Sequence, residues 1–305
     1  MRPVLMTLYQ EGYQHGVAAL LNSALRQGFD GRVDLYHDAP ALPPWTSQLV
    51  PNGQNSFLLD AIQIDFHRIT PPRHLGYHKA YAARDSLNAH PDCDAVIYAD
   101  PDVLFLAPWA FFSNWIPQGL AFCLDSHFPY LPSSHPWRET WRQLLYDATG
   151  LPARRLSVYP NSGFFGLTRD RMPFLDTWIA LTEHYKKTGG DTSAFFQRAR
   201  HAAIVGDQDL MAAALMGWDG PESIIGPDGM GFTGYFYLLS HDTGRPKAWA
   251  RNFALEALAG ISPSHSSSLF LDHCDGPIEV FSPAALRAKR ISLRVAQVIA
   301  RAWKR

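Results

Sequence analysis

The first forty residues alternate between strand-like and helix-like segments. Residues 4–9 and 33–37 are apolar runs rich in strand formers. Between them, residues 17–25 repeat leucine and valine at the three- and four-residue spacing of a helix, and a glycine-bounded turn follows. Two strands joined through a helix almost always form a right-handed parallel crossover. This order predicts an α/β fold built on a parallel sheet.

Later segments extend the same pattern. Residues 95–99 are apolar throughout, as expected of a central strand that is buried on both faces. Proline-rich residues 39–57 are expected to form a loop, and residues 109–159 an irregular, functional segment with several tryptophans. Further helices are expected at 79–87, 174–185 and 207–216, and a further strand at 235–239.

Composition and charge limit the class of protein. The chain has 305 residues, of which 47% are hydrophobic and 18% charged, so it can bury a large core. A net charge of -1 excludes a globally basic nucleic-acid binder. Of the 27 basic residues, seven follow Glu279 and no acidic residue does, which leaves 20 basic against 28 acidic in residues 1–279. An acidic body therefore carries a basic tail.

Cysteine content and hydropathy favour a cytoplasmic protein. Cys93, Cys123 and Cys274 are too few and too widely spaced for a disulfide framework, which favours a reducing compartment. The opening residues have too short an apolar run for a signal peptide, and no window of 18 apolar residues predicts a membrane span. We therefore expect a cytoplasmic location.

Two aspartates follow the expected central strand directly. Side chains two residues apart on an extended backbone point to the same side, so Asp100 and Asp102 can face one ion. Pro101 cannot donate to a sheet ladder, which places the pair at the strand end, where ligands bind in open α/β sheets. Carboxylate oxygens suit Mg²⁺ or Mn²⁺. A solvated turn is the alternative, because Asp-x-Asp is common by chance.

Two later segments carry further polar groups. Residues 207–209 (Asp-Gln-Asp) stand at the front of an expected helix, where carboxylates also serve as caps. His241 follows the strand-like run at 235–239 and can complete a metal site, while Gly244 allows a close backbone approach and Lys247 can meet a phosphate. A turn with an exposed histidine is the alternative, and His273 beside Cys274 is a second candidate for the third metal ligand.

Together these segments resemble the motifs of one enzyme family. Asp100-Pro101-Asp102 looks like the DxD motif of GT-A glycosyltransferases, and residues 207–209 resemble the DQD motif of the family 8 retaining glycosyltransferases. Residues 241–249 are similar to that family's HxxGxxKPW motif, with Ala248 in place of proline, and residues 161–163 to its N-A/S-G segment. The motifs occur in family order, and the resemblance covers about the first 250 residues.

The resemblance implies a metal-dependent retaining glycosyltransferase that moves a hexose from a nucleotide sugar, most often a UDP-sugar, to a glycan or lipid-linked glycan. It implies a Rossmann-like GT-A domain over residues 1–265, followed by a helical tail over 266–305. The implied ligands of Mn²⁺ or Mg²⁺ are Asp100, Asp102 and His241. Gln208 and Asp209 would face the anomeric carbon. Either Asp209 acts as the nucleophile or Gln208 stabilises an ion pair, and the sequence leaves both mechanisms open.

The same resemblance implies a set of donor contacts. The first strand would meet the nucleotide, Lys79 and Arg84 are two candidates for a basic phosphate contact, and the remaining residues would contact the sugar hydroxyls or the β-phosphate. The full set is Thr7, Tyr9, Lys79, Arg84, Asp100, Asn161, Asp207, Gly244 and Lys247. A sugar-nucleotide nucleotidyltransferase and a non-catalytic sugar- or partner-binding module on the same fold are the alternatives.

The basic end of the chain reads as an amphipathic helix from Ser282 to Arg305. Such a helix can lie on an anionic membrane surface, or its apolar stripe can pack on the domain. At a membrane, the implied acceptor is a lipid-linked glycan or lipopolysaccharide, and the aromatic residues of 109–159 would face it. The apolar stripe comprises Ile291, Val295, Val298, Ile299 and Ala302, with Leu286, Leu293 and Trp303 on or near it.

Overall fold

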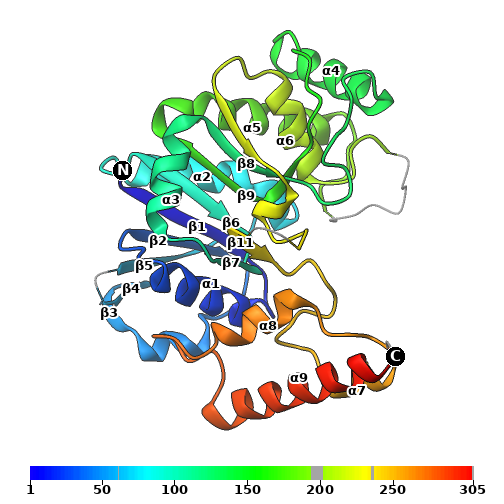
Figure 1. Cartoon of the computed structure of the whole chain (residues 1–305). Helices are drawn as coiled ribbons and strands as arrows, with labels where there is room; N and C mark the ends of the chain where they lie inside the picture. The colour runs from blue at the N-terminus through cyan, green and yellow to red at the C-terminus, as the bar shows by residue number, and fades with distance from the viewer. Residues whose placement is uncertain (61, 194–201, 235–236, 304–305) are drawn as a thin grey trace.

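A large, mostly parallel sheet runs through the middle of the molecule (Figure 1). The computed structural model describes residues 1–60, 62–193, 202–234 and 237–303. Within them, the strands follow one another across the sheet as β10 (Glu222–Ile225), β8 (Leu120–Leu124), β9 (Pro160–Thr168), β6 (Ala95–Ala99), β1 (Pro3–Tyr9), β2 (Arg32–His37), β5 (Ile62–Arg68), β4 (Ser56–Leu59) and β3 (Val50–Gly53). The four central neighbours β6, β1, β2 and β5 are parallel, and β9 and β4 are antiparallel to them.

Helices cover both faces of this sheet. One face carries α1 (Gln14–Arg26), α3 (Trp109–Trp115), α7 (Phe253–Leu258), α8 (His265–Asp272) and α9 (Pro283–Trp303). The other carries α2 (Lys79–Ala89), α4 (Pro136–Thr149), α5 (Met172–Lys187) and α6 (Asp207–Met216). The expected mixed α/β architecture with a parallel core is thereby confirmed.

The strand pattern explains the two layers. Every residue of β1 is buried, and its side chains alternate between the two cores. Val4 and Met6 pack against the α2 layer, whereas Leu5 and Tyr9 pack against the α1 layer. The continuous apolar runs seen in the sequence are therefore strands buried on both sides.

Two expected irregular segments are in fact structured. Residues 39–57 contain the edge strand β3 and the first half of β4, and Pro51 is tolerated because β3 is exposed at the sheet edge. Residues 109–159 contain α3, β8 and α4, so their prediction as irregular is wrong. Pro136 lies in the first turn of α4, where proline lacks only an N–H that has no helical partner.

A small second sheet joins distant parts of the chain. Strand β7 (Val103–Phe105) pairs antiparallel with β11 (Leu239–His241), so that Val103 lies opposite His241. The expected strand at 235–239 falls partly on residues 235 and 236, which lie outside the described residues. Because of this pairing, the segment after β11 lies beside the turn that follows the central strand β6.

The residues after 265 share the core of the α1 face. Asn22 of α1 is 1% exposed, and its amide donates to the carbonyls of His273 (2.9 Å) and Ile278 (2.7 Å). The Ile278 N–H donates back to the Asn22 carbonyl oxygen at 3.0 Å. The segment between α8 and α9 is thus tied to the first helix of the chain.

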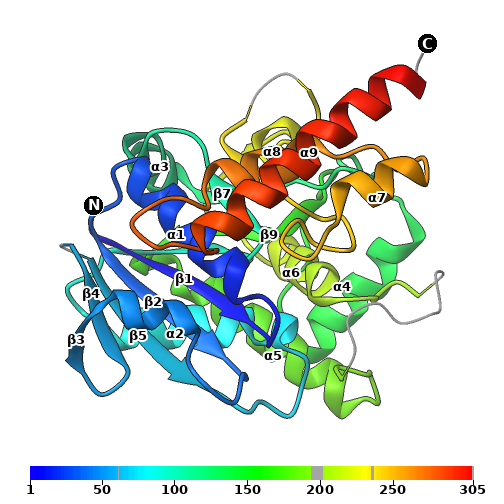
Figure 2. The same ribbon diagram turned by 90° about the horizontal axis from the view of Figure 1, so that it is seen from below.

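Helix α9 packs on the molecule through one part of its apolar side, with Ile299 of the stripe against the core of the α1 face. Figures 1 and 2 show it beside α7 and α8, and Leu286, Leu293 and Ala296 are buried there. Val295 and Val298 of the apolar stripe instead remain 44% and 66% exposed. None of the helices in the described residues has the length and apolar character needed to cross a membrane.

We expect Asn22→Ala to lower the free energy of unfolding by about 2–4 kcal/mol. The substitution leaves two buried carbonyls and one N–H without partners, and each such loss costs about 1–3 kcal/mol. Urea unfolding of the full chain measures the effect, and Asn88→Ala on the exposed side of α2 is the matched control. An Asn22→Ala midpoint equal to that of the control would contradict this anchoring.

Candidate functional site

Chemistry-bearing side chains gather at the carboxyl end of the parallel strands. Asp100 follows β6 directly, and its N–H donates to the Gly163 carbonyl at 2.8 Å. Strand β9 is antiparallel to β6, so its beginning, with Asn161 and Ser162, lies at this same edge. Asp125 follows β8, the next strand across the sheet. This is the edge at which open α/β sheets bind ligands.

Asp100, Asp102 and His241 converge as the sequence motifs suggest. The His241 Nε2 atom lies 3.3 Å from Asp102 Oδ1 and 3.8 Å from Asp100 Oδ2. One ligand atom from each residue lies within 4.8 Å of the others, a spacing at which they could hold one metal ion. His241 and Asp102 are mostly buried, with side chains 8% exposed, whereas the Asp100 side chain is 23% exposed. The cluster therefore opens toward solvent on the Asp100 side.

Two glycines allow the close approach of these groups. A β-carbon on Gly163 would stand 2.5 Å from His241 Cε1, so only glycine leaves room for the imidazole. A β-carbon on Gly16 of α1 would stand 2.2 Å from the Pro101 carbonyl oxygen. Helix α1 thus presses directly against the Asp-Pro-Asp turn, and the N-A/S-G segment needs its glycine for steric reasons.

Lys247 occupies the far side of the Asp102 carboxylate. Its ammonium group donates to Asp102 Oδ2 and to the Asp242 carbonyl. Asp242 in turn accepts from the Ala248 N–H at 3.0 Å, which fixes the turn between them. Burial alone would raise the pKa of Asp102, but His241 and Lys247 outweigh it and lower that pKa. Asp102 is consequently ionised at neutral pH.

Of the two basic candidates from α2, only Lys79 reaches this region. Its ammonium group is buried and lies 3.0 Å from Asp100 Oδ1 and 3.1 Å from Asp207 Oδ2. Burial acts to lower the pKa of Lys79, but the two carboxylates prevail and raise it, so the lysine stays charged. Arg84 instead pairs with Asp176, 3.4 Å away, and both side chains are well exposed.

A network of amides surrounds Asp125, a residue that the motifs did not single out. Asn161 and Gln208 donate to the same carboxylate oxygen of Asp125, at 3.1 and 3.2 Å. The Gln208 carbonyl oxygen accepts from the Ser162 N–H at 3.1 Å. Sequence reasoning did not select Asp125, because it lies in the segment that was expected to be irregular. Its position directly after the apolar run of β8 is the feature that could have indicated it.

Asp209 faces inward at the start of α6. One carboxylate oxygen accepts from the Tyr159 hydroxyl at 2.7 Å, and the other accepts from the N–H groups of Val205 (2.7 Å) and Gly206 (3.2 Å). The residue is 2% exposed, and burial raises its pKa to about 6 against these hydrogen bonds. Gln208, its neighbour, is only partly buried.

The remaining candidates lie around the same edge. Thr7 and Tyr9 are buried at the end of β1, and the Tyr9 ring stacks on His37 with centroids 5.3 Å apart. Gly244 is exposed in the turn between His241 and Lys247. His273 instead hydrogen-bonds the Leu269 carbonyl in α8, and the described cluster of candidate ligands around Asp100 does not include it.

Most tryptophans of residues 109–159 belong to the core rather than to a binding wall. Trp109 and Trp115 are 6% exposed and Trp141 is fully buried. Four aromatic residues of this segment are exposed: Phe111 (36%), Phe128 (49%), Tyr130 (67%) and Tyr146 (63%). Of these, Phe128 and Tyr130 follow Asp125 closely in the chain. Phe128 contacts the partly buried Trp137 edge to face, with centroids 6.0 Å apart.

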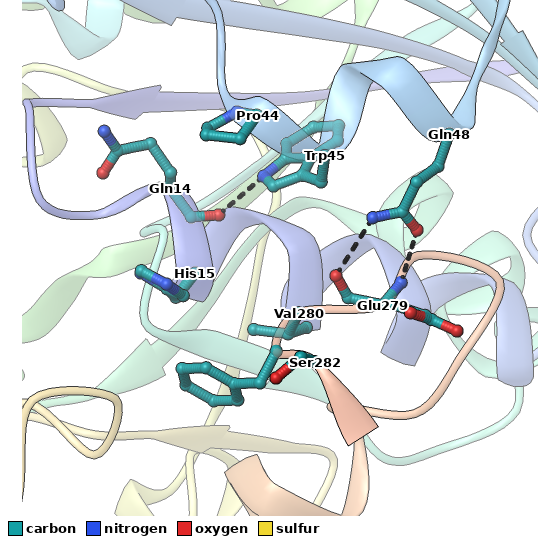
Figure 3. A pocket seen from close by; sticks show the side chains of 9 residues that line it. Gln14, His15, Pro44, Trp45, Gln48, Glu279, Val280 and Ser282 are labelled. Atoms are coloured by element: carbon teal, nitrogen blue, oxygen red, sulfur yellow. Dashed lines mark hydrogen bonds between the residues drawn. The ribbon is translucent and has the colours of Figure 1, made fainter. Parts of the chain in front are cut away.

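A separate cavity of about 310 Å³ lies on the outer side of α1 (Figure 3). It sits between the short 3₁₀ helix Pro44–Gln48 and residues 279–282, and none of the candidate residues above lines it. Gln48 exchanges two hydrogen bonds with the backbone of Glu279 across one side. Its lining residues are Gln14, His15, Pro44, Trp45, Gln48, Glu279, Val280, Phe281 and Ser282.

A scan against protein-family models finds no match to this chain, and a search of curated proteins finds none either. Function therefore has to be inferred from the geometry of the site. That geometry combines two carboxylates and an imidazole with two lysines and a group of amides at one sheet edge. Such a set can bind a divalent ion, a polyanion, or both together.

We expect the stability of Asp209→Asn relative to wild type to increase between pH 4 and pH 7. The wild-type carboxyl group binds its proton more tightly when folded, so wild type loses stability as pH rises from about 4 to about 6. A shift of about two pKa units corresponds to about 3 kcal/mol. Urea unfolding in EDTA across this range, with exposed Asp219→Asn as control, measures the difference. A pH-independent difference would show that Asp209 does not titrate there.

Proposed function

We propose that the protein is a GT-A type, metal-dependent retaining glycosyltransferase that moves a hexose from a UDP-sugar to a glycan or lipid-linked glycan. The convergence of Asp100 and Asp102 with His241, far apart in the chain, carries this proposal. Gln208 and Asn161 lie at the same edge, and their segments follow the order of the family motifs, which supports the proposal further.

The candidate ligands fit the ion that the proposal requires. Asp100 and Asp102 offer hard oxygen atoms and His241 offers one nitrogen, a set suited to Mn²⁺ and acceptable to Mg²⁺. The His241 Nε2 atom faces both carboxylates, 3.3 Å from Asp102 Oδ1 and 3.8 Å from Asp100 Oδ2, so this nitrogen would be the third ligand. When bound, such an ion would add positive charge where the leaving diphosphate becomes more negative.

One lysine could extend this positive charge along the diphosphate. Lys247 neutralises Asp102, the same carboxylate that would hold the ion, so binding of the ion would free its ammonium group for a phosphate oxygen. Lys79 stays buried between Asp100 and Asp207, where it offsets the repulsion between these carboxylates. A fixed cation at the leaving group stabilises developing charge without reorganisation, which is typically the largest contribution to catalysis.

On the sugar side, Gln208 rather than Asp209 is the group presented to the donor. Both oxygens of Asp209 are occupied by Tyr159 and by backbone N–H groups, so its carboxylate cannot turn toward a sugar without uncapping α6. Gln208 is held on Asp125 and is partly exposed. We therefore assign Gln208 to the anomeric face, Asp125 and Asn161 to the sugar hydroxyls, and Asp209 to positioning the turn.

We expect the protein to hydrolyse a nucleotide sugar slowly in the presence of Mn²⁺, and Asp102→Asn to lower that rate at least ~100-fold, as loss of one preorganised charge does. A panel of nucleotide sugars with detection of released nucleotide diphosphate measures it. Asp176→Asn, an exposed carboxylate on α5, is the matched control. Arg84→Met should stay within about twofold of wild type, because exposed ion pairs contribute little.

Full activity of Asp102→Asn or His241→Ala with metal would contradict the assignment of the site. Absence of turnover with every donor and metal would contradict the proposed reaction itself. Unfolding curves for each variant, run without metal, separate loss of chemistry from loss of fold.

The outward face of α9 supports an anionic membrane surface as a partner. Arg287, Arg294 and Arg301 are exposed and lie seven residues apart, so they form one row along the helix. Beside that row are the exposed stripe residues Ile291, Val295 and Val298, and α7 adds further exposed apolar side chains. The apolar set is Leu255, Leu258, Ile261, Ile291, Val295 and Val298. An apolar stripe flanked by arginine is the pattern of a helix that lies in a lipid headgroup layer.

We expect the protein to float with vesicles that contain phosphatidylglycerol and not with neutral phosphatidylcholine vesicles. Replacing the three arginines by glutamine should weaken binding about 100-fold, since each contributes about 1 kcal/mol. Ile291→Ser with Val298→Ser should also release the protein, whereas Val50→Ser, at a 63% exposed position on β3, should not. Equal binding to neutral vesicles, or none to either, would contradict this docking surface.

A further inference from the structure

A second group of imidazoles and carboxylates lies between β2, β5 and the end of α2. Asp34 of β2 and Asp65 of β5 lie opposite each other in the parallel register, and His67 follows two residues later on the same side. His90 reaches the group from the residue after α2. Strand β1 lies between β2 and β6, the strand that Asp100 follows, and none of the members of this group belongs to the site described above.

The donor atoms of this group converge on one buried oxygen. His67 Nε2 and His90 Nε2 each lie 3.1 Å from Asp34 Oδ1. Ligand atoms of Asp34, Asp65 and His90 also lie within 4.8 Å of one another. The Asp34 side chain is completely buried, whereas that of His67 is 35% exposed, so an ion could enter from the His67 side.

Neighbouring side chains orient the group. The Tyr36 ring stacks on His67 with centroids 4.6 Å apart, and Gln63 donates to both oxygens of Asp65 at 3.1 and 3.0 Å. Such second contacts are typical of built metal sites, where they fix the direction of each ligand. Asp34 Oδ2 is buried without a hydrogen bond of normal geometry in the described part of the chain, although the Ser86 hydroxyl lies near the carboxylate.

We propose that Asp34, Asp65 and His90 bind one transition-metal cation of the zinc class, with His67 as a positioning residue that donates to Asp34. Two carboxylate oxygens and one imidazole nitrogen match three of the ligands that tetrahedral Zn²⁺ accepts, and the fourth position would be open to water. Two histidines that simply donate to one carboxylate are the simpler arrangement, but it does not account for Asp65, which lies within ligand distance of both Asp34 and His90. An ion among the three would join β2, β5 and the end of α2, and it is independent of the proposed reaction.

Cobalt is a probe of this site because tetrahedral Co²⁺ with nitrogen and oxygen ligands absorbs visible light strongly. The full-length protein is depleted with a chelator, titrated with Co²⁺, and then competed with Zn²⁺. We expect one equivalent of Co²⁺ to give the tetrahedral spectrum and Zn²⁺ to displace it. The same spectrum should persist in Asp102→Asn, which removes a ligand of the other candidate metal site.

His90→Gln decides the assignment, because glutamine can still donate to Asp34 while it is a poor metal ligand. It should weaken Co²⁺ and Zn²⁺ binding at least tenfold, and Zn²⁺ should no longer raise the unfolding temperature as we expect it to do in wild type. His67→Gln keeps a donor to Asp34 and removes no ligand, so it should bind Co²⁺ as wild type does, and so should the control His184→Gln on α5. The proposal is wrong if wild type gives no tetrahedral Co²⁺ spectrum, if His90→Gln keeps it, or if Asp102→Asn alone abolishes it.

Discussion

The pairing of β7 with β11 is the contact on which the candidate site depends. It is short, yet it places His241 opposite Val103, one residue beyond Asp102. The Asp242 N–H then donates to the Asp102 carbonyl at 3.0 Å, which extends the pairing to the aspartate itself. The imidazole and the two carboxylates are separated by about 140 residues of chain, and this ladder is what brings them together in space. Gly163 completes the arrangement by leaving the imidazole room.

Sequence reasoning identified the central elements because they are long, periodic or directly followed by chemistry. The strand at Ala95–Ala99 and the helix at Asp207–Met216 are apolar runs whose ends carry aspartates. Helix α4 was missed because several prolines favoured an irregular segment over residues 109–159, although Trp137, Trp141 and Leu144 repeat at helical spacing. The apolar stripe of α9 was recognised, but only packing divides this side of the helix into residues that face the core, such as Leu293, and residues that face outward, such as Val295 and Val298.

Within the site, sequence spacing predicted which residues meet but not how each is used. Lys79 and Arg84 were equivalent candidates on one helix, and only packing separates a buried lysine between two carboxylates from an exposed arginine. Gln208 and Asp209 were likewise adjacent candidates. The Asp209 carboxylate accepts from the backbone N–H groups before α6, whereas the Gln208 amide donates to Asp125 on the open side of the site. Asp125 belongs to none of the sequence motifs. It reaches the site because β8, the strand before it, pairs with β9.

Charge balance links the buried site to the basic end of the chain. Asp100, Asp102 and Asp207 are gathered at one edge, where Lys79 and Lys247 are the lysines that contact them within the described residues, so an added cation would complete the neutralisation there. The compensating arginines lie on α9, on the outer face of the α1 layer. The near-zero net charge of the sequence thus results from two separated and opposite regions. An anionic surface attracts the arginine row and repels the acidic edge, which would orient the molecule on it.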